Sequence, residues 1–107
     1  MVANARIPMT ALVGLGLLVS AGSALAQRTA EEVANACAGA FTLPDGTCDC
    51  IGDRSLDALN DAQRDWYVLS VTGQSDAAEA VVGQMSVQEV MDAATFLRTS
   101  PVDCVGG

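Results

Sequence analysis

The sequence predicts an all-α protein, a small bundle of four to five short helices with a cysteine-pinned turn or hairpin, held together by two disulfides. Three observations lead to this prediction. Apolar residues recur at helical spacing through most of the chain after residue 26. Serine or threonine followed three positions later by glutamate marks two helix starts. The chain also has four cysteines, enough for two disulfides.

Residues 1–26 have the three parts of a secretory signal peptide. Arg6 supplies the positive charge, residues 10–22 are apolar, and Ala24-Leu25-Ala26 is a cleavage pattern with small residues at its ends. We therefore expect cleavage before Gln27 and a periplasmic or secreted protein. The alternative is a retained anchor, but the apolar stretch is shorter than the roughly 20 residues that span a bilayer.

The part that remains, residues 27–107, is predicted to be a single small helical domain with disulfides. Removing the signal peptide from the 107 residues leaves 81. A hydrophobic core of this size is marginal, so the two disulfides are expected to supply a large share of the stability.

The first helix is predicted to begin at Thr29, which can form a capping box with Glu32. Val33 and Cys37 lie on its apolar stripe, so Cys37 should face the core. Gly39 is expected to end this helix.

The next segment is predicted to contain the turn or hairpin. Residues 41–43 are expected to be extended, and Pro44-Asp45-Gly46 has the residues of a tight turn. Residues 47–51 are then expected to return as the second arm, pinned by their cysteines because a two-stranded piece is unstable alone.

Two helices are predicted in the middle of the chain. A short one spans residues 55–59, and Asn60 caps a longer one at residues 61–72. Gly73 stands where a helix ends in the left-handed conformation. Residues 66–71 are rich in residues that favour strands, but the signals at both ends favour a helix.

The last two helices are predicted to be capped by Ser75 and Ser86. Ser86 and Glu89 form the second capping box, and Met85 and Val90 can form a hydrophobic staple across it. The final helix should stop before Pro101. Its buried stripe is predicted to be Val87, Val90, Ala94 and Leu97, with Phe96 beside it, and Met85 and Met91 are assigned to the core.

Cys37, Cys48, Cys50 and Cys104 are predicted to form the two disulfides. A bond between Cys48 and Cys50 would close a strained ring, so Cys37 should pair with one of them and Cys104 with the other. Pairing Cys37 with Cys48 and Cys50 with Cys104 is favoured because these loops do not interleave. The crossed pairing stays open.

A second hypothesis treats Cys48-Asp49-Cys50 as a thiol-disulfide redox motif. Acidic residues in and around the motif should raise the thiol pKa and lower its reactivity, so a structural role is favoured. We expect no metal and no cofactor. The cysteine spacing does not match a zinc site, and the aspartates at every fourth position from 45 to 65 do not match a calcium-binding EF-hand loop.

Charge and composition exclude further functions. The part after residue 26 keeps all 13 acidic residues and four of the five arginines, which gives a net charge of −9. Such a surface repels nucleic acid and anionic lipid, so we expect neither nucleic-acid binding nor membrane binding after signal cleavage. The chain has no histidine, which removes imidazole-based catalysis, and we expect no enzymatic activity.

Trp66 and Tyr67 are the candidate contact residues for a protein partner. Neighbours on a helix point about 100° apart, so both cannot face one core, and one should be partly exposed. Exposed aromatic residues are enriched at protein interfaces. The alternative is an aromatic residue at the edge of the core with its polar atom in water.

The order of the cysteines, one followed by a Cys-x-Cys motif and a final one, resembles that of small exported bacterial helical proteins of unknown role. That resemblance implies a fold and no activity. The chain is also similar in size, export and helical class to the small acid-stress chaperones of the periplasm, although those carry one disulfide. We therefore expect a non-catalytic binding or accessory protein of the cell envelope, with a redox protein and a passive structural or acid-stress holdase as alternatives.

Overall fold

The computed structural model describes residues 27–106, and the predicted signal peptide lies outside this range. The described part is all helical, and two disulfides cross-link it. Its five helices are α2 (Ala30–Ala40), α3 (Thr47–Ala58), α4 (Asp61–Val71), α5 (Ser75–Val82) and α6 (Val87–Gly106). The predicted fold class is therefore confirmed.

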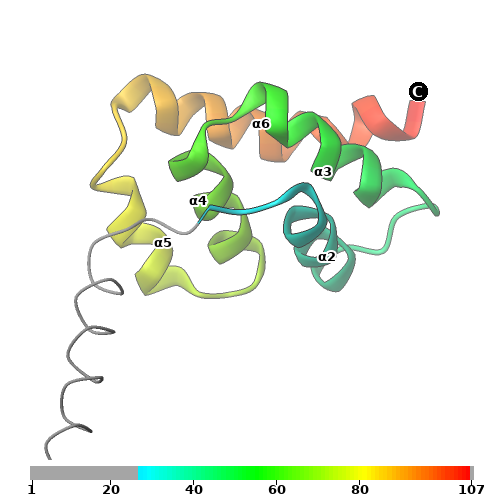
Figure 1. The fold of residues 1–107 in the computed structure, drawn as a ribbon, viewed down its shortest axis with the longest axis horizontal. Helices are drawn as coiled ribbons and strands as arrows, with labels where there is room; N and C mark the ends of the chain where they lie inside the picture. Colours follow the sequence, from blue (N-terminus) through cyan, green and yellow to red (C-terminus); the bar gives the residue numbers. More distant parts are fainter. Residues whose placement is uncertain (1–26, 107) are drawn as a thin grey trace, which may run out of the picture.

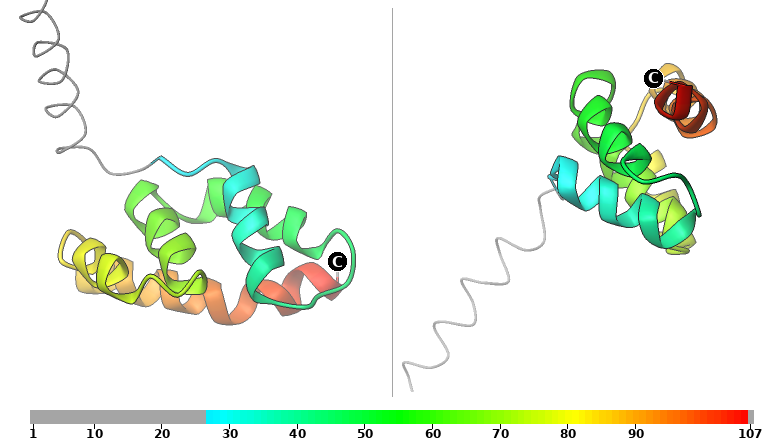
Figure 2. Two further views of the ribbon diagram at one scale, coloured as in Figure 1. Left: turned by 90° about the horizontal axis from the view of Figure 1, so that it is seen from below. Right: turned by 90° about the vertical axis from the view of Figure 1, so that its right-hand side faces the viewer.

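The longest helix, α6, runs along one side of the molecule and passes α4 and α3 (Figures 1 and 2). Helix α2 packs against α3 at one end, and α5 packs against α4 at the other. The main core lies where α2, α3, α4 and α6 meet and includes Val33, Ile51, Tyr67 and Phe96. A smaller cluster joins α4 to α5.

Helix α2 begins as predicted. The backbone N–H of Glu32 donates to Thr29 Oγ1 at 3.1 Å, and the backbone N–H of Thr29 donates to Glu32 Oε1 at 2.9 Å. The helix continues through Gly39 to Ala40, one residue further than the sequence predicts. Val33 and Cys37 are fully buried on its inner face.

The predicted hairpin is wrong, because residues 47–51 form the first turns of α3 rather than a strand. The Pro44-Asp45-Gly46 turn is present, with Gly46 at φ 86°, and the backbone N–H of Thr47 donates to the Pro44 carbonyl. Helix α3 then continues to Ala58 and absorbs the separate short helix predicted at residues 55–59. Ile51 and Ser55 lie one turn apart on its buried face.

Gly52 lies in the middle of α3 because two helices cross there. A Cβ atom at this position would lie 2.3 Å from the backbone oxygen of Ala30 and 3.2 Å from the Ala34 side chain. The glycine therefore marks a close approach of α2 to α3.

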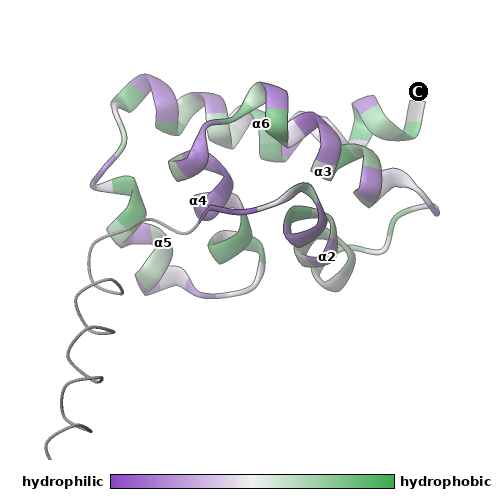
Figure 3. Cartoon of the chain, viewed as in Figure 1, coloured by the Kyte–Doolittle hydropathy of each residue, from purple (hydrophilic) through white to green (hydrophobic). Residues whose placement is uncertain are grey.

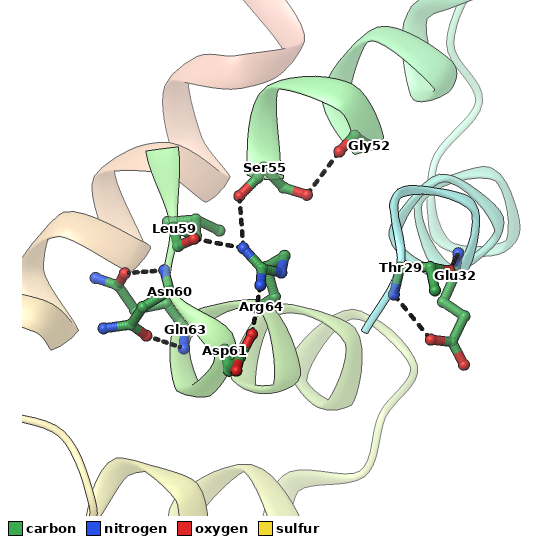
Figure 4. A network of polar contacts seen from close by, with 9 residues as sticks. All are labelled: Thr29, Glu32, Gly52, Ser55, Leu59, Asn60, Asp61, Gln63 and Arg64. Atoms are coloured by element: carbon green, nitrogen blue, oxygen red, sulfur yellow. Dashed lines mark hydrogen bonds and ion pairs between the residues drawn. The ribbon is translucent and has the colours of Figure 1, made fainter. Parts of the chain in front are cut away.

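Helix α4 has a complete capping box at Asn60 and Gln63, of which the sequence predicted only the Asn60 cap. The Arg64 guanidinium donates to the backbone carbonyls of Ser55 and Leu59 and also contacts Asp61 (Figure 4). It thus satisfies the Leu59 carbonyl at the C-terminal end of α3, where helices leave such groups free, and adds a second bond to the Ser55 carbonyl, which already accepts from the backbone N–H of Leu59.

Gly73 follows α4 in the left-handed conformation, as predicted, with φ 79°. Ser75 is the first residue of α5, so the predicted cap at this position is off by one residue. Gln74 is the N-cap, and its side chain makes no capping hydrogen bond.

Helix α6 differs from the prediction in both length and orientation. It continues through Pro101 to Gly106, whereas the sequence predicts an end before Pro101. The capping box of Ser86 and Glu89 is present. The buried residues are Ala93, Phe96, Ser100 and Cys104, while Val87 and Met91, both predicted to be buried, are 77% and 57% exposed.

Candidate functional site

The two disulfides join Cys37 to Cys48 and Cys50 to Cys104, the pairing that the sequence favours. The Cα atoms of the two pairs are 5.6 Å and 5.8 Å apart, within the usual range. Cys48 and Cys50 point to different sides of α3, so that one bond reaches α2 and the other reaches α6. All four cysteines are paired, and the structure brings no free thiol to the Cys-x-Cys motif.

Of the two candidate contact residues, Trp66 reaches the surface and Tyr67 does not. Tyr67 is 1% exposed, and its ring meets the edge of Phe96 with centroids 6.0 Å apart. Trp66 is half-buried and packs against both clusters of the core. A partner can therefore contact the outer edge of Trp66 in this conformation, while contact with Tyr67 requires the core to open.

Three buried side-chain polar atoms have no hydrogen-bond partner among residues 27–106: Nε of Arg64 and the hydroxyl groups of Tyr67 and Ser100, the two hydroxyl groups belonging to residues that are at most 2% exposed. Burial raises the pKa of Tyr67 to about 12, because the apolar surroundings disfavour the charged phenolate. Tyr67 therefore stays neutral at any physiological pH. This property is typical of a core residue and gives no general base.

Glu89 also has a shifted pKa, and its cause is again structural. The backbone N–H of Ser86 and the side-chain amide of Asn60 donate to its carboxylate and hold the pKa of Glu89 below its usual value. These bonds use the carboxylate for helix capping. They keep the carboxylate charged, and both of its oxygens accept hydrogen bonds from residues of the fold.

Two neighbouring open hollows lie along α2 and α3, and each has acidic residues in its lining. One of about 400 Å³ lies beside the Pro44 turn and is lined by Asn35, Phe41, Asp45 and Asp49, among others. The other, of about 340 Å³, is lined by Glu31, Asp49 and Asp53 over a floor of alanines. No lining residue of either hollow is basic. Within residues 27–106, no group of three histidine, cysteine, aspartate or glutamate residues is placed to hold a metal ion.

Four of the six large hydrophobic side chains that are exposed in the described range lie on the outer face of α6, by which we mean Val87, Met91, Val102 and Val105 together with Arg98. The four apolar side chains are 77%, 57%, 73% and 52% exposed. At 100° per residue, these positions fall on the side of the helix opposite the buried residues Phe96 and Ser100. Hydrophobic residues thus continue along α6 to its C-terminal end (Figure 3), and the helix is apolar on two sides.

Arg98 lies within this outer face, is exposed and forms no ion pair with any residue that the structure describes. The other arginines of the described range each lie within 4.0 Å of a carboxylate. Arg28 binds Asp65, Arg54 contacts Asp103 and Arg64 contacts Asp61. Arg98 therefore differs from them in having its charge free in the middle of an apolar strip.

The sequence did contain a signal for this orientation of α6, in the position of Cys104. If the helix is continued to Cys104, the residues on the same face are Ser100, Phe96 and Ala93, at four, eight and eleven positions before it. Because Cys104 must reach another cysteine, that face has to point inward. Because the helix predicted from sequence ends before Pro101, the prediction does not place Cys104 on the same face as Ala93, Phe96 and Ser100.

No family model matches the chain, and no similar curated protein or solved structure was found. Among the described residues, no helix combines the length and the apolar character needed to cross a membrane. What the chain does must therefore be inferred from its own surfaces.

Proposed function

We propose that this chain is a small exported protein of the cell envelope that acts by binding another protein chain rather than by catalysis, with the outer face of α6 as its contact surface. Two disulfides fit an oxidising compartment, which is where such bonds form and persist. The proposal of export rests on them together with the signal-peptide pattern at residues 1–26.

The outer face of α6 carries the proposal of binding. Single exposed apolar residues are ordinary, but contiguous ones mark interaction sites. Here two pairs, Val87 with Met91 and Val102 with Val105, lie on one side of a 20-residue helix, on either side of Arg98, and the opposite side of the helix is used by the core. The exposed edge of Trp66 is a second, smaller apolar contact point.

Export is tested by the intact mass and free-thiol count of the protein recovered from cells that make it, with thiols blocked at lysis. We expect a chain that begins at Gln27, with no free thiols and the two disulfides of the structure. A chain that retains residues 1–26 would contradict export. Free or mixed thiols at Cys48 and Cys50 would instead favour a redox function.

Binding is tested by placing a photo-crosslinking amino acid at Met91 in the cell that makes the protein. Met91 is exposed on the proposed contact surface, and Ala77 on α5 is an exposed control position. We expect a discrete crosslinked product from position 91 and none from position 77. Equal labelling at both positions, or none at either, would argue against the outer face of α6 as a binding surface.

A further inference from the structure

The outer face of α6 has a pattern that matches itself when the helix is turned end to end. Val87 and Val105 lie near its two ends, and Met91 and Val102 lie one turn or less further in. A two-fold axis perpendicular to α6, passing outside its outer face at the level of residue 96, therefore places Val87 against Val105 of a second copy and Met91 against Val102. Contact surfaces that are symmetric in this way are typical of two-fold dimers.

The charges of α6 select the antiparallel arrangement. In a parallel pair, Arg98 would face Arg98 of the other copy at the centre of the contact, so two like charges would meet there. In the antiparallel pair, Arg98 lies opposite residues 94–95 of the second copy, two to three residues from Asp92. At about 1.5 Å of rise and 100° per residue, this is roughly 4 Å along the helix, but Asp92 also lies about 120° around the helix from Arg98. The arginine side chain must therefore extend around the flank of the partner helix to reach it.

We propose that two copies of this chain associate through the outer faces of α6, antiparallel, with reciprocal ion pairs between Arg98 and Asp92. This inference rests on the proposed function, since it names the occupant of the same contact surface. Arg98, without an ion-pair partner in the described chain, gains one from the second copy. Asp92 is exposed on the flank of α6, about 100° around the helix from Met91, where it accepts a hydrogen bond from Gln88 at 2.8 Å.

The expected dimer is weak. Helix α6 has 20 residues and is therefore about 30 Å long. One face of such a helix buries less than the roughly 800 Å² per partner of a standard stable interface. The net charge of −9 on each copy also opposes association until salt screens it. We expect dissociation on the order of micromolar concentrations or above, in buffer of physiological ionic strength.

The test is sedimentation velocity of the exported, oxidised protein from about 1 to 500 µM. We expect a shift from monomer to dimer for the native chain and at least a tenfold weaker dimer for Met91→Glu. Ala77→Glu adds the same charge at an exposed position on α5 and should leave the dimer unchanged. A monomer throughout the range would overturn the proposal.

A charge exchange tests the arrangement. Arg98→Asp should weaken the dimer, and the double variant Arg98→Asp with Asp92→Arg should restore it. Because these residues are exposed, the melting temperature of the monomer should change little. Failure of the double variant to restore association would contradict the reciprocal ion pairs.

Crosslinking at Met91 distinguishes the two orientations, because the chain has no lysine and trypsin therefore cuts after Arg98. An antiparallel dimer links position 91 to the reduced peptide 99–107 of the second copy, whereas a parallel dimer links it to the peptide that contains Met91. If the purified chain stays monomeric but position 91 crosslinks to a different protein in the cell, the dimer fails and the proposed binding function stands. If neither occurs, both fail.

Discussion

The side-chain amide of Asn60 donates a hydrogen bond to the carboxylate of Glu89 at 2.7 Å and so joins the first turns of α4 and α6. Both residues already cap their own helices, Asn60 through Gln63 and Glu89 through Ser86. The Gln63 side chain adds a second connection by donating to the backbone carbonyl of Glu89 at 2.8 Å. Two capping boxes, each local in sequence, thereby fix how the two helices meet.

Replacing Asn60 should therefore destabilise the protein more than replacing an ordinary cap. Asn60→Ala removes the cap of α4, worth about 1 kcal/mol, and also the bond to Glu89, for a total of about 1.5–2 kcal/mol. Ser86→Ala, the matched control, loses one cap and should lower the free energy of unfolding by about 1 kcal/mol. Urea unfolding measures both. Equal losses of unfolding free energy in the two variants would mean that the hydrogen bond between Asn60 and Glu89 contributes nothing to stability.

Glu89 should contribute to acid sensitivity. Its pKa is lower in the folded protein than in the unfolded chain, because the N–H of Ser86 and the amide of Asn60 favour the charged form. Its contribution is therefore complete above the unfolded pKa of about 4.3 and is lost as the pH falls through the folded value. Glu89→Gln should flatten the decline of stability below pH 4.5, measured by urea unfolding at several pH values. An unchanged decline would assign the acid sensitivity to other carboxylates.

Gly52→Ala should destabilise the protein although it places alanine in a helix. The new Cβ would lie 2.3 Å from the Ala30 backbone oxygen, so α2 and α3 must separate, at a cost of about 1–3 kcal/mol. Gly39→Ala in α2 is the control. A Cβ there has nothing within 4 Å, and the substitution should stabilise by about 0.5–1 kcal/mol. Thermal melts distinguish the two, and a stabilising Gly52→Ala would show that the helices have room to move apart.

Tyr67 should behave as a core residue with a dispensable hydroxyl. Tyr67→Ala is expected to lose about 3–5 kcal/mol, while Tyr67→Phe should be neutral or stabilising, because the hydroxyl has no partner among the described residues. A loss of more than about 1 kcal/mol in Tyr67→Phe would show that the hydroxyl makes a hydrogen bond in solution, for example to a buried water.

The titration of Tyr67 provides an independent check. Its pKa rises from 10.0 to about 12 in the folded protein, so the unfolded chain loses its proton first and stability should fall as the pH rises from 10 to 12. The chain has one tyrosine, and tyrosinate absorbance therefore reports this group alone. A folded protein that titrates near pH 10 would contradict the burial of the ring.

The two disulfides should differ in their effects on stability and on α6. By loop entropy, the separations of 11 and 54 residues correspond to about 3 and 4 kcal/mol. Replacing Cys50 and Cys104 by alanine should also release the turn of α6 after Pro101, because the proline cannot donate a helical hydrogen bond there. Hydrogen exchange of residues 102–106 should then accelerate. Replacing Cys37 and Cys48 is the control and should leave those amides protected.

The helices whose ends carry side-chain caps could be predicted from sequence. Thr29, Asn60 and Ser86 each begin a helix, because their side chains accept a hydrogen bond from a backbone N–H three residues later. Such bonds depend on neighbours in sequence alone. The preferred disulfide pairing could be predicted for a similar reason, because it follows from the order of the cysteines along the chain. The structure confirms it.

The segments that were missed depend on contacts distant in sequence. Residues 47–51 favour a strand by composition, but packing of α3 against α2 makes them helical, and Gly52 is required by Ala30 across that contact. Pro101 ends helices in general, yet here the bond from Cys104 to Cys50 holds the following turn in place. The outer face of α6 could not be predicted from sequence, because Val102 and Val105 belong to it only if the turn after Pro101 is helical.

The disulfides connect cysteines in their order along the chain, Cys37 to Cys48 and Cys50 to Cys104. If the protein is exported as proposed, it enters the oxidising compartment with its N-terminus first. Cys48 and Cys50 emerge almost together and long before Cys104, so the first bond can form only among Cys37, Cys48 and Cys50. Folding of α3 onto α2 brings Cys37 to Cys48 and leaves Cys50 facing α6, so one free partner remains for Cys104.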